Sequence, residues 1–265
     1  MLFLLRTIRR KLLAGNQVIP YLLYGIGEIF LVVIGILIAV QIDNWNEGRK
    51  SEIAEINFYR NILEDLEKDS SKLAYYLHFQ TKRIEYLDTL LTYVRDPGRE
   101  MGREKFGKYV EPIYYSIELT YYATTFESAK STGLYTNFSN QHILKELTQY
   151  YEDYAPLEKT FSSITRFVEN HFEPIMYTVP ESYMTKETGD LVIHEASVQP
   201  FYDKIAAIPD NRQMDYDYRK ILTNQKLGNY IIGDLGRSYN ALGKLTAQQA
   251  ELERLKSSIY EILNN

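Results

Sequence analysis

The chain has four histidines and no cysteine, so a metal centre or nucleophilic site would need histidine, carboxylate and hydroxyl groups. The histidines are scattered, at His78, His142, His171 and His194. None belongs to an H-E-x-x-H motif, and no two stand at a spacing typical of metal ligands. His171-Phe172-Glu173 and His194-Glu195 come nearest to ligand pairs. Isolated histidines beside glutamate are usually surface residues, so we predict no catalytic residue, no metal site and no cofactor.

Other motifs that carry chemistry are also missing from the sequence. No glycine-rich loop fits a phosphate or dinucleotide site, and there is no G-x-S-x-G element. The lack of cysteine excludes disulfides and thiol nucleophiles, and it fits an oxidising compartment. The net charge is −5, although the N-terminal segment is basic, so residues 43–265 are acidic. This balance argues against nucleic acid as a partner.

One carboxylate, Glu28, lies within an otherwise apolar stretch from Tyr21 to Ile42. A carboxylate in hydrocarbon is costly and usually faces protein or water. Residues at 3-4 spacing around it form one helix stripe, here called the Glu28 stripe: Gly25, Glu28, Val32, Gly35 and Ala39. Small residues let a second helix approach closely, and a buried polar group then finds a partner. We predict a membrane interface along this stripe, with a second copy of the chain or another membrane protein.

Two other roles for Glu28 stay open. It lies seven residues from Tyr21, roughly 10 Å along a helix, so its carboxylate could reach lipid headgroups or stay protonated and alone. Intramembrane carboxylates also serve in proton relays. A short tail, one span with a carboxylate and an exterior domain resemble, in arrangement only, the stator subunits of proton-driven envelope machines.

The 24 tyrosines are an unusual feature of the composition. Tyrosine combines rigid apolar area with a polar tip, which suits half-buried faces of helical bundles and also interfaces. We favour the first role for most of them. The alternative is a binding surface, and its candidate patch is Tyr150, Tyr151 and Tyr154.

The Tyr21–Ile42 stretch is expected to form a single helix. Its 22 residues give a helix of roughly 33 Å, enough to cross a hydrocarbon core of about 30 Å. A cleaved signal peptide is the alternative, but the apolar run is long and Leu37-Ile38-Ala39 is a poor cleavage site. We predict an uncleaved transmembrane helix over residues 21–42, in contact with the lipid bilayer.

The basic residues near the span predict its orientation. Residues 1–20 are rich in arginine and lysine. Leucine and isoleucine residues alternate with these basic residues, a pattern typical of a basic amphipathic helix. Four basic residues precede the span, and three follow it within twenty residues. We predict a single-pass inner-membrane protein with a cytoplasmic N-terminus and a periplasmic domain over residues 43–265.

Two long amphipathic patterns predict the frame of that domain. Apolar residues recur at 3-4 spacing from Leu63 to Val94 and stop at Asp96-Pro97-Gly98, a turn signal. A matching pattern runs from Ile231 to Leu263. Long amphipathic helices at opposite ends of a domain usually pack antiparallel. The predicted fold class is mainly α, with one N-terminal transmembrane helix followed by an extracytoplasmic bundle of long antiparallel helices.

Shorter helices are expected between the two long ones, near 115–131, 139–153 and 156–172. Gly133 suits the left-handed position after a helix end, with Leu134 folding back, and Ser139 or Asn140 suits the next N-cap. Residues 173–215 hold four prolines and predict an irregular excursion, with a small hairpin around Leu191-Val192-Ile193.

The segment YLLYGIGEIFLVVIGILIAVQIDNWNE resembles a family of uncharacterised bacterial membrane proteins, a domain of unknown function. The segment TTFESAKSTGLYTNFSNQHILKELTQYY is a looser match to the same family. The resemblance implies a single-span protein of a Gram-negative-type envelope with an exterior helical region. It implies no activity.

These observations predict a membrane-anchored, non-enzymatic interaction, sensing or assembly module of the cell envelope. The first alternative is a stator-like energy-coupling subunit that uses Glu28. The second is an envelope enzyme with an unrecognised site in 173–215, which a deep pocket holding His171 or His194 against carboxylates would support.

Overall fold

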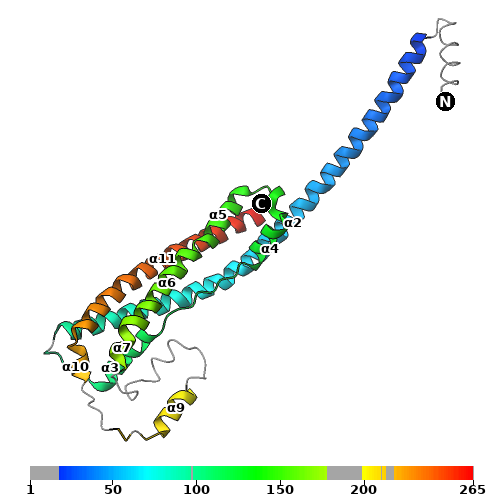
Figure 1. Cartoon of the computed structure of the whole chain (residues 1–265). Coiled ribbons are helices and arrows are strands. Elements are labelled where there is room, and N and C mark those ends of the chain that lie inside the picture. Colours follow the sequence, from blue (N-terminus) through cyan, green and yellow to red (C-terminus); the bar gives the residue numbers. More distant parts are fainter. Residues whose placement is uncertain (1–17, 97, 178–198, 210, 213–217, 265) are drawn as a thin grey trace. The chain divides into compact units, whose positions relative to one another are not determined.

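The structure is a computed structural model, and it describes residues 18–96, 98–177, 199–209, 211–212 and 218–264 (Figure 1). These residues are helical almost throughout and include no strand. The elements in chain order are α2 (Val18–Arg95), α3 (Arg103–Val110), the 3-10 turn η1 (Glu111–Tyr114), α4 (Thr124–Thr132), the 3-10 turn η2 (Leu134–Asn137), α5 (Gln141–Glu152), α6 (Tyr154–Phe167), the π-helical turn η3 (Val168–Phe172), α7 (Glu173–Met176), α9 (Gln199–Ala207), α10 (Tyr218–Leu222) and α11 (Gln225–Asn264). The predicted mainly α class is confirmed.

The chain divides into two units, which are described separately. Unit 1 holds Met1–Asn57 and Thr136–Ser139, and unit 2 holds Phe58–Tyr135 and Asn140–Asn265. Helix α2 contributes residues to both units. The boundaries that the sequence predicts for the span, after residues 20 and 42, stay predictions.

Unit 1 consists mainly of the first part of α2, which is long and apolar enough to cross a membrane by length and composition. Its large apolar side chains are exposed, among them Leu31 at 71 % and Ile29 at 66 %. Two hydrogen bonds join α2 to the short second segment of this unit. Ser51 Oγ donates to the Asn137 carbonyl at 3.2 Å, and the Ser139 N–H donates to Glu55 Oε2 at 2.8 Å.

Unit 2 is framed by the second part of α2 and by α11, which run antiparallel. Side chains of α2 meet α11 in reversed order, because Ser70 bonds Glu253, Gln80 bonds the Ser238 carbonyl and Arg83 bonds Asp234. This confirms the predicted pairing of the two long helices. Apolar side chains along both helices are buried, including Leu66, Leu73, Leu87, Leu245, Leu252 and Ile259. Each contributes roughly 1.5–3 kcal/mol through burial.

Helices α5 and α6 also pack against α11 in unit 2, and they run antiparallel to it (Figure 1). Gln248 donates to the Tyr150 carbonyl at 2.8 Å, and Lys244 donates to Thr160 Oγ1 at 2.6 Å. At Gly233 the helices approach so closely that a Cβ atom would lie 2.8 Å from Phe167 Cζ. Glycine permits this crossing.

The helix predicted near 115–131 is wrong in its first half. Residues 115–123, here called the strap, are not helical, and α4 starts only at Thr124. The strap lies along α2, whose side chains replace the hydrogen bonds that a helix would supply. Tyr76 Oη accepts the Thr120 N–H at 2.9 Å, and Asp69 Oδ1 accepts the Tyr122 N–H at 2.7 Å.

The other short helices agree closely with expectation, with corrections at their ends. Gly133 has the predicted positive φ, 66°, at the end of α4. Leu134 is 46 % exposed, and its packing back on the helix stays a prediction. Asn140 is the N-cap of α5, yet its side chain makes no capping bond. The helix expected over 156–172 starts at Tyr154 and widens into the π-helical turn η3.

Parts of the expected excursion over 173–215 are helical, namely α7 and α9. The predicted hairpin around Leu191-Val192-Ile193 lies outside the described residues. So do residues 1–17 of the basic amphipathic segment that the sequence predicts over residues 1–20.

Candidate functional site

The Glu28 stripe lies on one face of α2, because the helix is continuous through its residues and their spacing is 3-4. Val32 is 57 % exposed, and Glu28, Gly35 and Ala39 are exposed as well. No atom lies within 4 Å of a Cβ built on Gly25 or Gly35. Within unit 1 the stripe is therefore open to a partner, and its role as an interface stays a prediction.

A buried ion pair lies at the centre of unit 2. Arg83 Nη2 lies 2.6 Å from Asp234 Oδ2, and the two side chains are 1 % and 0 % exposed. Tyr230 and Ser238 donate their hydroxyls to the same carboxylate, at 2.5 and 3.1 Å. Burial, together with the Asp234 charge, raises the pKa of Tyr230 far above its usual value, so its hydroxyl stays protonated and donates.

The other guanidinium nitrogen of Arg83 is bound to backbone. Nη1 donates to the carbonyls of Pro112, Ile113 and Tyr115 at 3.3, 2.9 and 2.8 Å. The ion pair therefore ties α2, α11 and the start of the strap together. Removing one partner of such a pair leaves an uncompensated buried charge.

Sequence reasoning missed this polar cluster, although a signal was present. A third series on α2 repeats every seven residues and is buried: Ile62, Asp69, Tyr76, Arg83 and Leu90. Its three central members are polar, so a search for apolar periodicity passes over it. Polar residues at these heptad positions indicate that groups of another segment supply hydrogen-bond partners there.

A second polar cluster centres on Asp69, which is fully buried. The Tyr150 hydroxyl donates to Asp69 Oδ2 at 3.1 Å, and the Tyr150 and Tyr154 hydroxyls are 3.0 Å apart. Burial raises the pKa of Asp69 to about 6, and the nearby Asp65 charge adds to the effect. Hydrogen bonds from Tyr122 and Tyr150 act in the opposite direction.

The structure brings Tyr150, Tyr151 and Tyr154 together, but inside unit 2. They are 0 %, 7 % and 1 % exposed, and the rings of Tyr121 and Phe126 stack on Tyr154 and Tyr151. This placement matches the favoured role of the tyrosines, packing within a bundle. A binding role for these three residues stays a prediction. Because their side chains are buried, a partner would have little access to them.

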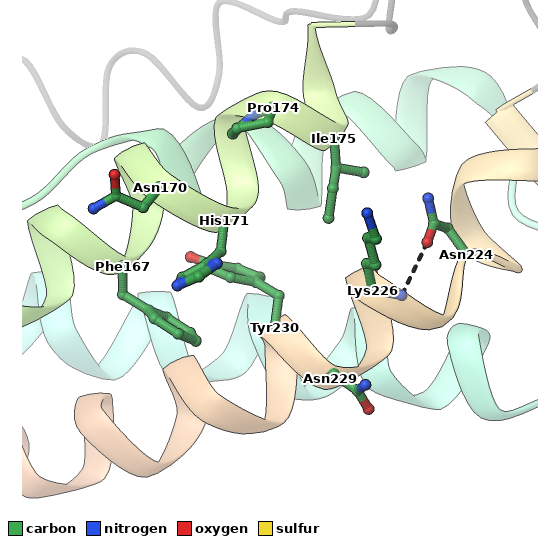
Figure 2. A pocket seen from close by; sticks show the side chains of 9 residues that line it. All are labelled: Phe167, Asn170, His171, Pro174, Ile175, Asn224, Lys226, Asn229 and Tyr230. Carbon is green, nitrogen blue, oxygen red and sulfur yellow. Dashed lines mark hydrogen bonds between the residues drawn. The ribbon is translucent and has the colours of Figure 1, made fainter.

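A pocket of about 590 Å³ opens between η3 and the start of α11, and it contains His171 (Figure 2). The π-helical turn brings Asn170 and His171 to one wall, while Asn224 and Lys226 line the other. Asn224 caps α11, because its Oδ1 accepts the Lys226 N–H at 2.9 Å. His171 packs against the Phe167 ring, with centroids 4.8 Å apart.

This pocket meets the expectation for an envelope enzyme only in its histidine. No carboxylate is among the described residues that line it. The other candidate, His194, lies outside the described residues. In the part of the chain that the structure describes, no group of three His, Asp or Glu residues could hold a metal ion.

Comparison with known proteins gives one match. A family of unknown function, DUF6090, matches residues 28–164, from Glu28 through the strap to α6. No curated protein and no solved structure matches the chain. The match covers about half of the chain and confirms the resemblance seen in the sequence. The chain belongs to DUF6090, a family of unknown function.

Proposed function

We propose that this protein is a membrane-anchored interaction or assembly module of the cell envelope, without enzymatic activity of its own. One observation carries the proposal. The first part of α2 is apolar, long enough to cross a membrane, and none of the apolar window is buried within the chain. Exposed apolar side chains in such number are stable in lipid or against another protein.

The anchor associates through the Glu28 stripe. Gly25, Gly35 and Ala39 leave room for close approach of a second helix, and nothing in the described chain fills that room at either glycine. Glu28 then gains a hydrogen-bond partner at the interface instead of facing lipid alone. The partner is a second copy of the chain or another membrane protein.

The proposed topology is a cytoplasmic N-terminus, one pass through the inner membrane and a periplasmic unit 2. Because the chain has no cysteine, single introduced cysteines report their location without background. A cysteine at Ser71, on exposed α2 surface, should react with a membrane-impermeant maleimide in intact spheroplasts. A reaction only after lysis would place unit 2 in the cytoplasm and overturn the topology.

The interface is tested by disulfide crosslinking of the full chain in native membranes. Val32→Cys lies on the stripe, and Ile34→Cys, about 200° around the helix, is the matched control. We expect a crosslinked species with Val32→Cys only, as a dimer or with a cysteine-bearing partner. Equal crosslinking of both variants would mean random collision and would reject the stripe as an interface.

Substitution of Glu28 separates the two roles of the carboxylate. Glu28→Leu removes hydrogen bonding and should weaken the Val32→Cys crosslink, whereas Glu28→Gln keeps hydrogen bonding and should preserve it. The stator-like alternative also predicts that Glu28→Gln keeps the crosslink, but it predicts in addition that this substitution abolishes a proton-driven process in cells.

A further inference from the structure

Helices α6 and α11 lie side by side in unit 2 (Figure 1). A groove of about 530 Å³ is lined by residues of these two helices. It is separate from the pocket at His171. Three cationic side chains line it, Lys159, Arg237 and Lys244, together with the hydroxyls of Thr160 and Ser163. No carboxylate is among its described lining residues. The groove is therefore positively charged in a chain whose net charge is −5.

The three cations have no carboxylate partner within ion-pair distance among the described residues. Glu158 is adjacent in sequence to Lys159, but it is not among the residues that line the groove. Cations that are not neutralised within the chain attract an anionic partner.

Arg237 is held in place by three contacts. Nη1 donates to the Gly233 carbonyl at 2.8 Å, and Nε donates to Ser163 Oγ at 3.3 Å. The guanidinium lies over the Phe167 ring, 3.9 Å from its centroid. A guanidinium fixed in this way binds a carboxylate with little loss of side-chain entropy.

Lys244 is positioned in the same manner at the other end of the groove. Its Nζ donates to Thr160 Oγ1 at 2.6 Å and to the Pro156 carbonyl at 3.2 Å. An ammonium has three donors, so one remains for a ligand. Arg237 and Lys244 are seven residues apart on α11, which separates their Cα atoms by roughly 10 Å.

Glycine keeps the groove open between the cations. Gly236 lines it, and no atom lies within 4 Å of a Cβ built there. Glycine weakens a helix interior, and nothing around Gly236 requires it for packing. A side chain at this position would project into the space that a ligand uses.

We propose that this groove binds an extended acidic peptide segment of a partner protein. The lining residues of α11 run from Ile232 to Lys244, roughly 18 Å along the helix axis, which an extended peptide of about five residues spans. Ile232, 48 % exposed, supplies apolar surface beside the charges. This site shares no residue with the Glu28 stripe, so either proposal can fail alone.

The test uses the full chain in non-ionic detergent micelles and a fluorescent peptide of about five glutamates, with a glutamine peptide of equal length as the neutral control. Binding is measured by fluorescence anisotropy. We expect the glutamate peptide to bind and the glutamine peptide not to. Arg237→Gln and Lys244→Gln should each weaken binding about tenfold or more, since each removes a hydrogen bond between charged groups.

Two matched variants keep the test specific. Lys145→Gln removes an exposed charge on α5, outside the groove, and should leave binding unchanged. Gly236→Leu fills the groove without changing charge and should abolish binding, whereas Gly243→Leu, at a glycine that is equally open and does not line the groove, should preserve it.

Several results would overturn the proposal. One is no binding of the glutamate peptide to the natural chain, and another is an equal loss with Lys145→Gln, which would indicate unspecific attraction. Binding that survives Gly236→Leu would place the peptide elsewhere. Competition by citrate as strong as that by unlabelled peptide would show a small-anion site instead of a peptide site.

Discussion

At the scale of single residues, the buried polar side chains of α2 distinguish this bundle from an apolar one. Asp69, Tyr76 and Arg83 occupy core positions, and each binds backbone groups of the strap or of its flanks. Their hydrogen bonds are needed, because an unpaired polar group in the core costs about 1–3 kcal/mol. Two buried atoms, Gln80 Oε1 and Arg83 Nε, have no partner in the described structure.

Asp69 should make stability depend on pH. Its pKa is about 6 in the folded chain against 3.8 unfolded, so between these values only the folded state holds the proton. The free energy of unfolding contributed by this group therefore falls as the pH rises through that window. From about pH 5 to about pH 7.5 the loss is about 1–2 kcal/mol.

Asp69→Asn should remove this contribution, because the amide oxygen still accepts hydrogen bonds but carries no charge. Chemical denaturation of the full chain in detergent, for both proteins at both pH values, measures the difference. An equal pH dependence in the two proteins would contradict the assignment.

At the scale of elements, the strap is where sequence-based prediction fails, and the reason is physical. Apolar spacing predicted α11, α5, α6 and the second part of α2 well, because these segments bury leucine and isoleucine at helical intervals. The strap carries helix-compatible residues, yet its N–H and carbonyl groups are bound by side chains 29 to 53 residues away. The sequence of residues 115–123 does not indicate which distant side chains bind their backbone groups. The pocket and groove next to α11 were missed for the same reason.

Arg83→Met should destabilise unit 2 by about 3–5 kcal/mol, since Asp234 would stay buried without its counter-ion. Adding Asp234→Leu should recover much of this loss, because a matched apolar pair replaces the ion pair. Lys82→Met, at the next residue and in an exposed pair with Glu85, is the control and should have little effect. Denaturant midpoints of the full chain measure all three, and equal effects of Arg83→Met and Lys82→Met would refute the role of the ion pair.

At the scale of the whole molecule, we propose two surfaces for partners, the Glu28 stripe in unit 1 and the basic groove in unit 2. The family resemblance, the mainly α class and the long apolar N-terminal helix were all predicted from sequence. The groove was not, because its cations come from two helices that only the fold brings together. If both proposals hold, the protein joins a partner in the membrane to a partner that binds unit 2.

If the two surfaces act independently, Gly236→Leu should leave the Val32→Cys crosslink unchanged. Crosslinking yields in native membranes, with and without the groove substitution, measure this. A changed yield would show that occupancy of the groove alters association in the membrane.

The strap also makes the bundle unusually easy to follow by amide hydrogen exchange. Non-helical segments normally exchange fast, yet the N–H groups of Thr120 and Tyr122 are bound by Tyr76 and Asp69. Their protection depends on α2 and not on any helix of their own. These two amides therefore exchange only when the strap separates from α2. Their exchange rates report the frequency of that separation, independently of fraying at the end of any helix.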